Sequence, residues 1–127
     1  MLICGIVIGK FNHEACLIDE TGHQISKSLR FPNTTDGGRK LLDYFNGCNP
    51  EKEVIVIGME STGHYWLSLY SFLFDQGFQV NVINPIQSDA IRNLFLRKTK
   101  NDAKDSFLIA ETIRIGRFSS TKLADED

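Results

Sequence analysis

The most constraining feature of this chain is the apolar run Leu-Ile-Cys-Gly-Ile-Val-Ile-Gly at residues 2–9. Apart from its two glycines every residue is apolar, which is typical of a β-strand buried on both faces. A second apolar run of this kind follows at residues 54–59. Strands buried on both faces need a helical layer on each side of the sheet. The two runs therefore predict an α/β fold in which residues 2–9 form the central strand.

The segment after the first run predicts a meander of antiparallel strands. Short strand-like runs between residues 10 and 31 are separated by Asn and Gly, which favour tight turns. In the third strand Ile25, Leu29 and Phe31 are set against polar neighbours, as in an outer strand with one solvated face. We expect three antiparallel strands up to residue 31.

The rest of the chain predicts alternating helices and strands. Thr34 or Thr35 is a suitable N-cap for a first helix, which Gly47 is expected to end. We then expect, in order, a strand at 54–59, a helix at 65–76, a strand at 78–83 and helices at 88–96 and 101–115. Three antiparallel strands followed by two strand–helix units are the arrangement of the ribonuclease H-like fold, an α/β mixed sheet with helices on both faces.

Composition limits the classes of protein that fit. A chain of 127 residues can form one domain with its own core. Cys4, Cys16 and Cys48 have no CxxC spacing and suit reduced thiols. No apolar run approaches the roughly 20 residues that a membrane span needs. We therefore expect a soluble, cytoplasmic protein with no membrane partner.

The net charge of -2 conceals a basic segment. Residues 92–122 carry eight basic and three acidic side chains, whereas residues 1–91 carry six basic and ten acidic ones. Such a segment is a candidate contact for a nucleic-acid backbone, although a solvated helix face would look the same. The candidate nucleic-acid-binding residues are Arg92, Arg97, Lys98, Lys100, Lys104, Arg114 and Arg117.

Three acids are candidates for a catalytic site. Glu60 directly follows the second apolar run, at the strand end where ligands gather in open α/β sheets. Asp102 and Asp105 are three residues apart and share one face of the last helix. All three also suit a plainer role, because acids are favoured near helix N-termini. If the fold gathers them at one sheet edge, their oxygens would select Mg²⁺ or Mn²⁺ for metal-assisted phosphodiester chemistry.

Four short motifs together resemble a known family. They are Gly5-Ile6-Val7-Ile8-Gly9-Lys10, Met59-Glu60-Ser61-Thr62-Gly63-His64-Tyr65-Trp66, Asn84-Pro85 and Lys98-Thr99-Lys100-Asn101-Asp102-Ala103-Lys104-Asp105. In this order they resemble the amino-terminal domain of the DEDD transposases, the insertion sequence 110 family that includes the Piv-type DNA invertases. The resemblance covers about residues 3–116.

The resemblance implies a RuvC-like ribonuclease H fold in which four acids bind divalent metal in a DNA recombinase. Glu60, Asp102 and Asp105 match three of these positions and would be the catalytic and metal-binding residues. The fourth acid belongs to a G-I-D-x-x-K pattern on the first strand, where this chain has Val7. Because that position is the most central of the four, Val7 is expected to weaken both Mg²⁺ or Mn²⁺ binding and strand cleavage.

The resemblance also implies partners and a further part of the protein. DNA is the expected partner, some family members use a structured guide RNA, and the full-length form is expected to be a homo-oligomer. Family members carry an additional carboxy-terminal domain. We therefore expect residues 1–117 to form the RuvC-like domain and residues 118–127 to be an acidic tail or the start of a linker.

Two other functions fit parts of the chain. A domain that keeps the fold and the basic surface but lacks an acid at position 7 would only bind nucleic acid or pair with another copy of itself. One lobe of an actin-like ATPase or sugar kinase would share the glycine-flanked first strand. That class needs two lobes around its nucleotide, and it leaves Asp102 and Asp105 without a role.

Overall fold

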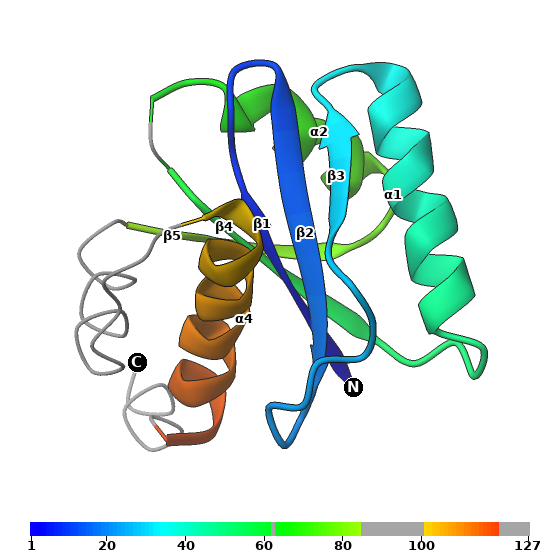
Figure 1. The fold of residues 1–127 in the computed structure, drawn as a ribbon, viewed down its shortest axis with the longest axis vertical. Helices are drawn as coiled ribbons and strands as arrows, with labels where there is room; N and C mark the ends of the chain where they lie inside the picture. Colours follow the sequence, from blue (N-terminus) through cyan, green and yellow to red (C-terminus); the bar gives the residue numbers. More distant parts are fainter. Residues whose placement is uncertain (62, 85–100, 120–127) are drawn as a thin grey trace.

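The computed structural model describes residues 1–61, 63–84 and 101–119 (Figure 1). Their helices and strands are, in chain order, β1 (Leu2–Val7), β2 (Asn12–Asp19), β3 (Leu29–Pro32), α1 (Thr35–Cys48), β4 (Ile55–Glu60), α2 (Trp66–Asp75), β5 (Gln79–Ile83) and α4 (Asp102–Ser119). This order agrees with the predicted one. The helix expected at 88–96 lies outside the described residues.

The strands form one mixed sheet in the order β3-β2-β1-β4-β5. β1 and β2 are antiparallel, as are β2 and β3, and β4 and β5 are added in parallel on the other side of β1. The apolar run at the start of the chain is therefore the central strand, as predicted. Two neighbours pair with it along its length, which explains why it is apolar on both faces.

Helices cover both faces of this sheet, as predicted. α1 and α2 lie on one face and α4 lies on the other (Figure 1). Cys4 and Ile6 of β1 pack with Leu41 of α1 in the first core, and Ile3 packs with Ile109 of α4 in the second. The alternation of side chains along β1 thus divides its residues between two cores.

The predicted ends of α1 and α2 are partly confirmed. Thr34 caps α1, because its Oγ1 accepts a hydrogen bond of 3.1 Å from the backbone N–H of Gly37. Gly77 follows α2 with a φ of +92°, a conformation that favours glycine. Gly47, however, lies inside α1 and does not end it. The helix continues to Cys48, and the side chain of Asn49 then bonds the backbone of Glu53.

The third strand is shorter than predicted. β3 holds only residues 29–32, and Ile25 is exposed and lies before the strand. The side chain of Asp19 accepts hydrogen bonds from the backbone N–H groups of Thr21 and His23, which forms a compact turn after β2. The chain leaves this turn with a single bridge between Ile18 and Gln24 before it pairs again. Local side-chain bonding therefore interrupts the expected ladder.

Two expectations from composition can be checked against the described residues. Cys4, Cys16 and Cys48 are free thiols. Burial raises the pKa of Cys16 to about 12, so this thiol stays protonated at neutral pH. None of the described helices is long and apolar enough to cross a membrane.

Candidate functional site at the carboxyl edge of the sheet

Val7 lies in a row of three side chains that crosses the sheet. Val7 of β1 pairs directly with Glu14 of β2, and Glu14 pairs with Arg30 of β3. Residues directly opposite each other in paired strands point to the same face. Val7 packs against the core beneath α4, so the row lies on the α4 face at the carboxyl end of β1.

Glu60 ends the strand on the other side of β1. It is the last residue of β4, and it pairs with Ile83 of β5. The parallel register pairs Ile6 with Met59, so Val7 and Glu60 are the next residues along the two strands. Val56 of β4 packs in the α4 core, and alternation gives Glu60 that same face. The predicted position of Glu60 at the carboxyl edge is confirmed.

The first turn of α4 carries the other two acids. Asn101 caps this helix, because its Oδ1 accepts a hydrogen bond of 2.8 Å from the N–H of Lys104 and its carbonyl accepts one of 2.9 Å from Asp105. Asp102 and Asp105 are thereby held in a regular first turn, as the spacing predicted. The side chain of Asp102 is 48% exposed.

A glycine on β1 lets α4 approach the sheet closely. A Cβ built on Gly5 would lie 2.1 Å from the carbonyl oxygen of Ser106 and 2.4 Å from the nitrogen of Ala110. Only a residue without a side chain fits between these backbones. At Gly58 of β4 an added Cβ would instead meet the side chain of Ile113, with Cγ1 2.4 Å away. Because the helix lies directly on β1 and β4, its first turn is brought to the edge where Val7 and Glu60 end their strands.

Arg30 connects this helix turn to the row on the sheet. Its Nη1 donates a hydrogen bond of 3.2 Å to Oδ2 of Asp102 and lies 3.9 Å from Oε1 of Glu14. The hydroxyl of Ser28 donates a further bond of 2.5 Å to Oε2 of Glu14. A guanidinium group therefore lies between two carboxylates of the site.

Sequence reasoning missed both Glu14 and Arg30. Their presence at the site depends on the pairing of Glu14 with Val7 and with Arg30 across three strands. Neither residue belongs to a motif, and each looks like an ordinary polar residue of a half-exposed strand. Only the register of the three meander strands would have indicated that these two residues lie there.

The acids do not form a complete metal-binding cluster. Within residues 1–61, 63–84 and 101–119, no group of three or more His, Cys, Asp or Glu side chains could hold a metal ion. Val7 places an apolar side chain where the central carboxylate was expected, and the carboxylate of Asp102 is hydrogen-bonded to Arg30. Among the described residues the site thus lacks a complete ligand set for a divalent ion, and metal binding by Glu60, Asp102 and Asp105 stays a prediction.

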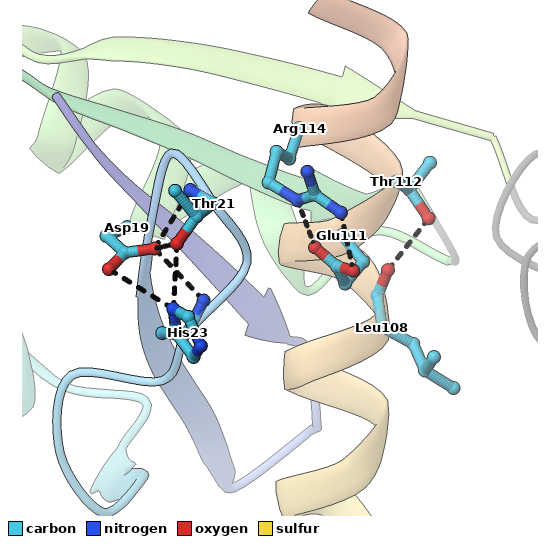
Figure 2. A network of polar contacts seen from close by, with 7 residues as sticks. All are labelled: Asp19, Thr21, His23, Leu108, Glu111, Thr112 and Arg114. Carbon is cyan, nitrogen blue, oxygen red and sulfur yellow. Dashed lines mark hydrogen bonds and ion pairs between the residues drawn. The ribbon is translucent and has the colours of Figure 1, made fainter. Parts of the chain in front are cut away.

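The candidate nucleic-acid-binding residues divide into three groups. Lys104 is exposed in the first turn of α4, beside the acids. Arg114 is bound to Glu111 by two hydrogen bonds, of 2.5 Å from Nε and 3.0 Å from Nη2 (Figure 2). The candidates outside the described residues are Arg92, Arg97, Lys98 and Lys100. The side chain of Arg117 also lies outside them.

The side chain of Arg114 is held by contacts within the fold. Glu111 is only 5% exposed, and its hydrogen bonds raise the pKa of the Arg114 guanidinium. The guanidinium also lies against Gly22 in the turn after β2, where an added Cβ would be 3.2 Å away. The Asp19–Thr21–His23 turn lies beside the helix there (Figure 2). Arg114 therefore joins α4 to this turn and neutralises a buried acid.

The strand order, the helices on both faces and the acids at the carboxyl edge define a RuvC-like member of the ribonuclease H-like fold class. Solved structures agree. RuvC of T. thermophilus in complex with a Holliday junction substrate has a TM-score of 0.63 and 11% identity, over 94% of this chain and 97% of that one. A fowlpox virus resolvase in complex with Holliday junction DNA has a TM-score of 0.58 and 17% identity, over 93% and 99%.

Sequence comparison then gives the family. The family model of the IS110-type DEDD transposases, described as transposase, matches residues 4–127. This chain belongs to that family. It is also 26% identical over 106 residues to the pilin gene-inverting protein of Moraxella bovis, a match that covers 84% of this chain and 32% of that protein. The chain thus spans about a third of the length of this curated relative. The resemblance found in the four motifs is confirmed.

Proposed function

We propose that this chain is the amino-terminal, RuvC-like domain of a DNA transposase or site-specific recombinase, and that its own strand-cleavage chemistry is impaired. Family membership supports the first part, as do the positions of Glu60 at the end of β4 and of Asp102 and Lys104 in the first turn of α4. The observation that carries the second part is Val7, whose side chain packs under α4 in the row that leads to Asp102. DNA is the proposed partner.

The geometry supports positioning of a DNA backbone more directly than it supports cleavage. Lys104 presents an exposed ammonium group within one turn of Asp102. A phosphate near these residues needs a cation between it and the carboxylates, since like charges repel. With an apolar Val7 and with Asp102 bound to Arg30, a divalent ion has few ligands to hold it there. We therefore expect weak Mg²⁺ or Mn²⁺ binding.

A second candidate function is a catalytically inactive domain that binds nucleic acid or pairs with another copy. The ion pairs of Arg30 with Asp102 and Glu14 favour it, because they neutralise the acids without a metal. Three further properties are proposed only for the full-length protein. They are guide RNA binding, homo-oligomerisation and the choice between transposition and inversion.

The test replaces Val7 by Asp and, as a control, by Asn. Both variants introduce the same shape into the row, but only Val7→Asp adds a carboxylate. We expect wild type and Val7→Asn to bind Mn²⁺ weakly in calorimetric titration, and Val7→Asp to bind at least tenfold more tightly. Asp102→Asn in the Val7→Asp background should remove the gain. Nicking of labelled branched and duplex DNA would be measured in parallel.

The outcomes separate the two parts of the proposal. Wild type should bind DNA with an affinity that falls as salt rises, because phosphate contacts release counterions. No DNA binding at low salt would contradict the recombinase-domain assignment. Equal Mn²⁺ affinity in wild type and Val7→Asp, or strand cleavage by wild type, would contradict impairment.

A further inference from the structure

The hairpin between β1 and β2 exposes an aromatic side chain at the candidate edge. Phe11 is 72% exposed, the highest value for a large apolar side chain among the described residues. The hairpin extends β1 beyond Val7 and projects past the sheet (Figure 1). The exposed ring is therefore accessible to a partner at this edge.

A hydrogen-bond network around the buried His13 holds this hairpin in place. His13 is 1% exposed; its Nδ1 accepts a bond of 3.2 Å from the N–H of Gly9, and its Nε2 lies 3.0 Å from Oδ1 of Asn33. Asn33 in turn donates from its Nδ2 to the carbonyl of Lys10 over 3.2 Å and from its backbone N–H to the carbonyl of Phe11 over 2.8 Å. Three consecutive hairpin residues are thus tied to the core.

This network explains why the exposed ring does not fold back. The carbonyls of Lys10 and Phe11 accept bonds from the side chain and the backbone of Asn33, and the Asn33 side chain is itself bonded to the buried His13, so the ring is carried by a fixed backbone. A rigid aromatic group loses little conformational entropy when it binds, which is the arrangement found where side chains serve as contacts. The buried His13 and the half-buried Asn33 thus hold a hairpin that carries an exposed aromatic ring.

Lys10 gives the exposed ring a positive neighbour. Its Nζ lies 5.2 Å from the centroid of the Phe11 ring. An aromatic face beside an ammonium group suits a nucleotide, because the ring can stack on a base while the ammonium pairs with the adjacent phosphate. A base inside a duplex is covered on both faces, so a ring can stack on it only if that base is unpaired or the step is opened.

We infer that Lys10 and Phe11 form a contact for an unpaired base in the bound DNA, with Phe11 stacking on the base and Lys10 pairing with a flanking phosphate. The inference rests on the proposed binding of DNA at this edge. It adds a preference for DNA that carries an unpaired base over continuous duplex. The preference comes from β1–β2 and is independent of the acids.

The experiment compares two DNA ligands of the same sequence. One carries 2-aminopurine as a single unpaired base, and the other carries it fully paired. Stacking on Phe11 should quench the fluorescence of the unpaired base. The variants are Phe11→Ala, Phe11→Trp and Lys10→Ala in the full chain of 127 residues, with circular dichroism to check folding. The matched control is Phe74→Ala, because Phe74 is 62% exposed but lies at the end of α2 that runs away from the carboxyl edge.

We expect Phe11→Ala to lose the quench and about tenfold or more of the affinity for the unpaired-base ligand, with little change for the paired one. Phe11→Trp should keep both the quench and the affinity. Lys10→Ala should weaken the binding of both ligands. Phe74→Ala should behave as wild type.

Three results would overturn the inference. If Phe11→Ala binds both ligands as wild type does, the contact is wrong while DNA binding stands. If wild type binds neither ligand at low salt, the proposed function fails as well. If wild type sediments as a dimer and Phe11→Ala as a monomer, with DNA affinity unchanged, the ring contacts a second copy of the chain.

Discussion

Arg30 of β3 donates a hydrogen bond of 3.2 Å to Asp102 at the start of α4, although 72 residues separate them in the sequence. Both side chains are about half exposed, so the pair is expected to contribute less than about 1 kcal/mol to stability. Its larger effect is electrostatic. A guanidinium bound to Asp102 competes with any other cation for that carboxylate.

Arg30→Gln should therefore increase cation binding more than it decreases stability. In the Val7→Asp background, we expect Arg30→Gln to tighten Mn²⁺ binding severalfold in calorimetric titration. The free energy of unfolding in urea, measured in the absence of metal, should change by less than about 1 kcal/mol. Arg39→Gln is the control, because Arg39 makes a similar exposed ion pair of 3.1 Å with Asp36 on α1. A loss of Mn²⁺ affinity on removal of Arg30 would contradict the competition.

Gly5→Ala should disrupt the packing of α4 on the sheet. The added Cβ would meet the backbone at Ser106 and Ala110, which cannot move as a flexible side chain would. We expect a loss of about 3 kcal/mol in the free energy of unfolding, the upper range for overpacking. Gly47→Ala is the control, since nothing lies within 4 Å of a Cβ there, and a gain of about 0.5–1 kcal/mol is expected inside a helix. Equal effects in urea unfolding would contradict the close approach.

Substitution of Lys104 should affect DNA binding, whereas substitution of Arg114 should affect stability. Lys104→Ala removes an exposed charge, so DNA affinity should fall and the salt dependence should decrease by about one phosphate contact, with stability nearly unchanged. Arg114→Ala leaves the buried Glu111 without its partner and should cost about 1–3 kcal/mol. Filter binding across salt concentrations and urea unfolding give the two quantities. A loss of DNA affinity in Arg114→Ala but not in Lys104→Ala would contradict this expectation.

His13 should make stability depend on pH. Burial lowers the pKa of His13 in the folded state below its ordinary value of 6.5, with the bond to Asn33 opposing this. Below pH 6.5 the unfolded chain therefore binds a proton that the folded protein does not. Stability contributed by the neutral ring is present above pH 6.5 and falls as the pH drops, until the lowered folded-state pKa is reached.

Urea midpoints at pH 7.5, 6.5 and 5.5 test this expectation. Wild type should lose stability over this window, and His13→Gln should lose less than wild type does. His23→Gln is the comparison variant for an exposed histidine, since the side chain of His23 is 84% exposed. An unchanged slope in His13→Gln would show that other groups cause the pH dependence.

Much of the fold could be predicted because its elements are marked by local signals. The strand of Leu2–Val7 is apolar throughout, Thr34 caps a helix with its hydroxyl, and Asn101 caps another. The length of β3 could not be predicted, since the turn at Asp19 takes backbone donors away from the ladder. Gly47 was expected to end α1, but without a positive φ it is only a tolerated helical residue.

The sequence by itself determined which of the described segments are buried strands and helices, and its motifs predict that Glu60, Asp102 and Asp105 share one site with Val7 in place of a fourth acid. These features depend on residue type and short spacing, which are local. Only the tertiary structure decided the neighbours of Val7. Glu14 lies opposite Val7, and Arg30 lies opposite Glu14, through the register of three strands. A register is set by the packing of the whole sheet rather than by any one strand.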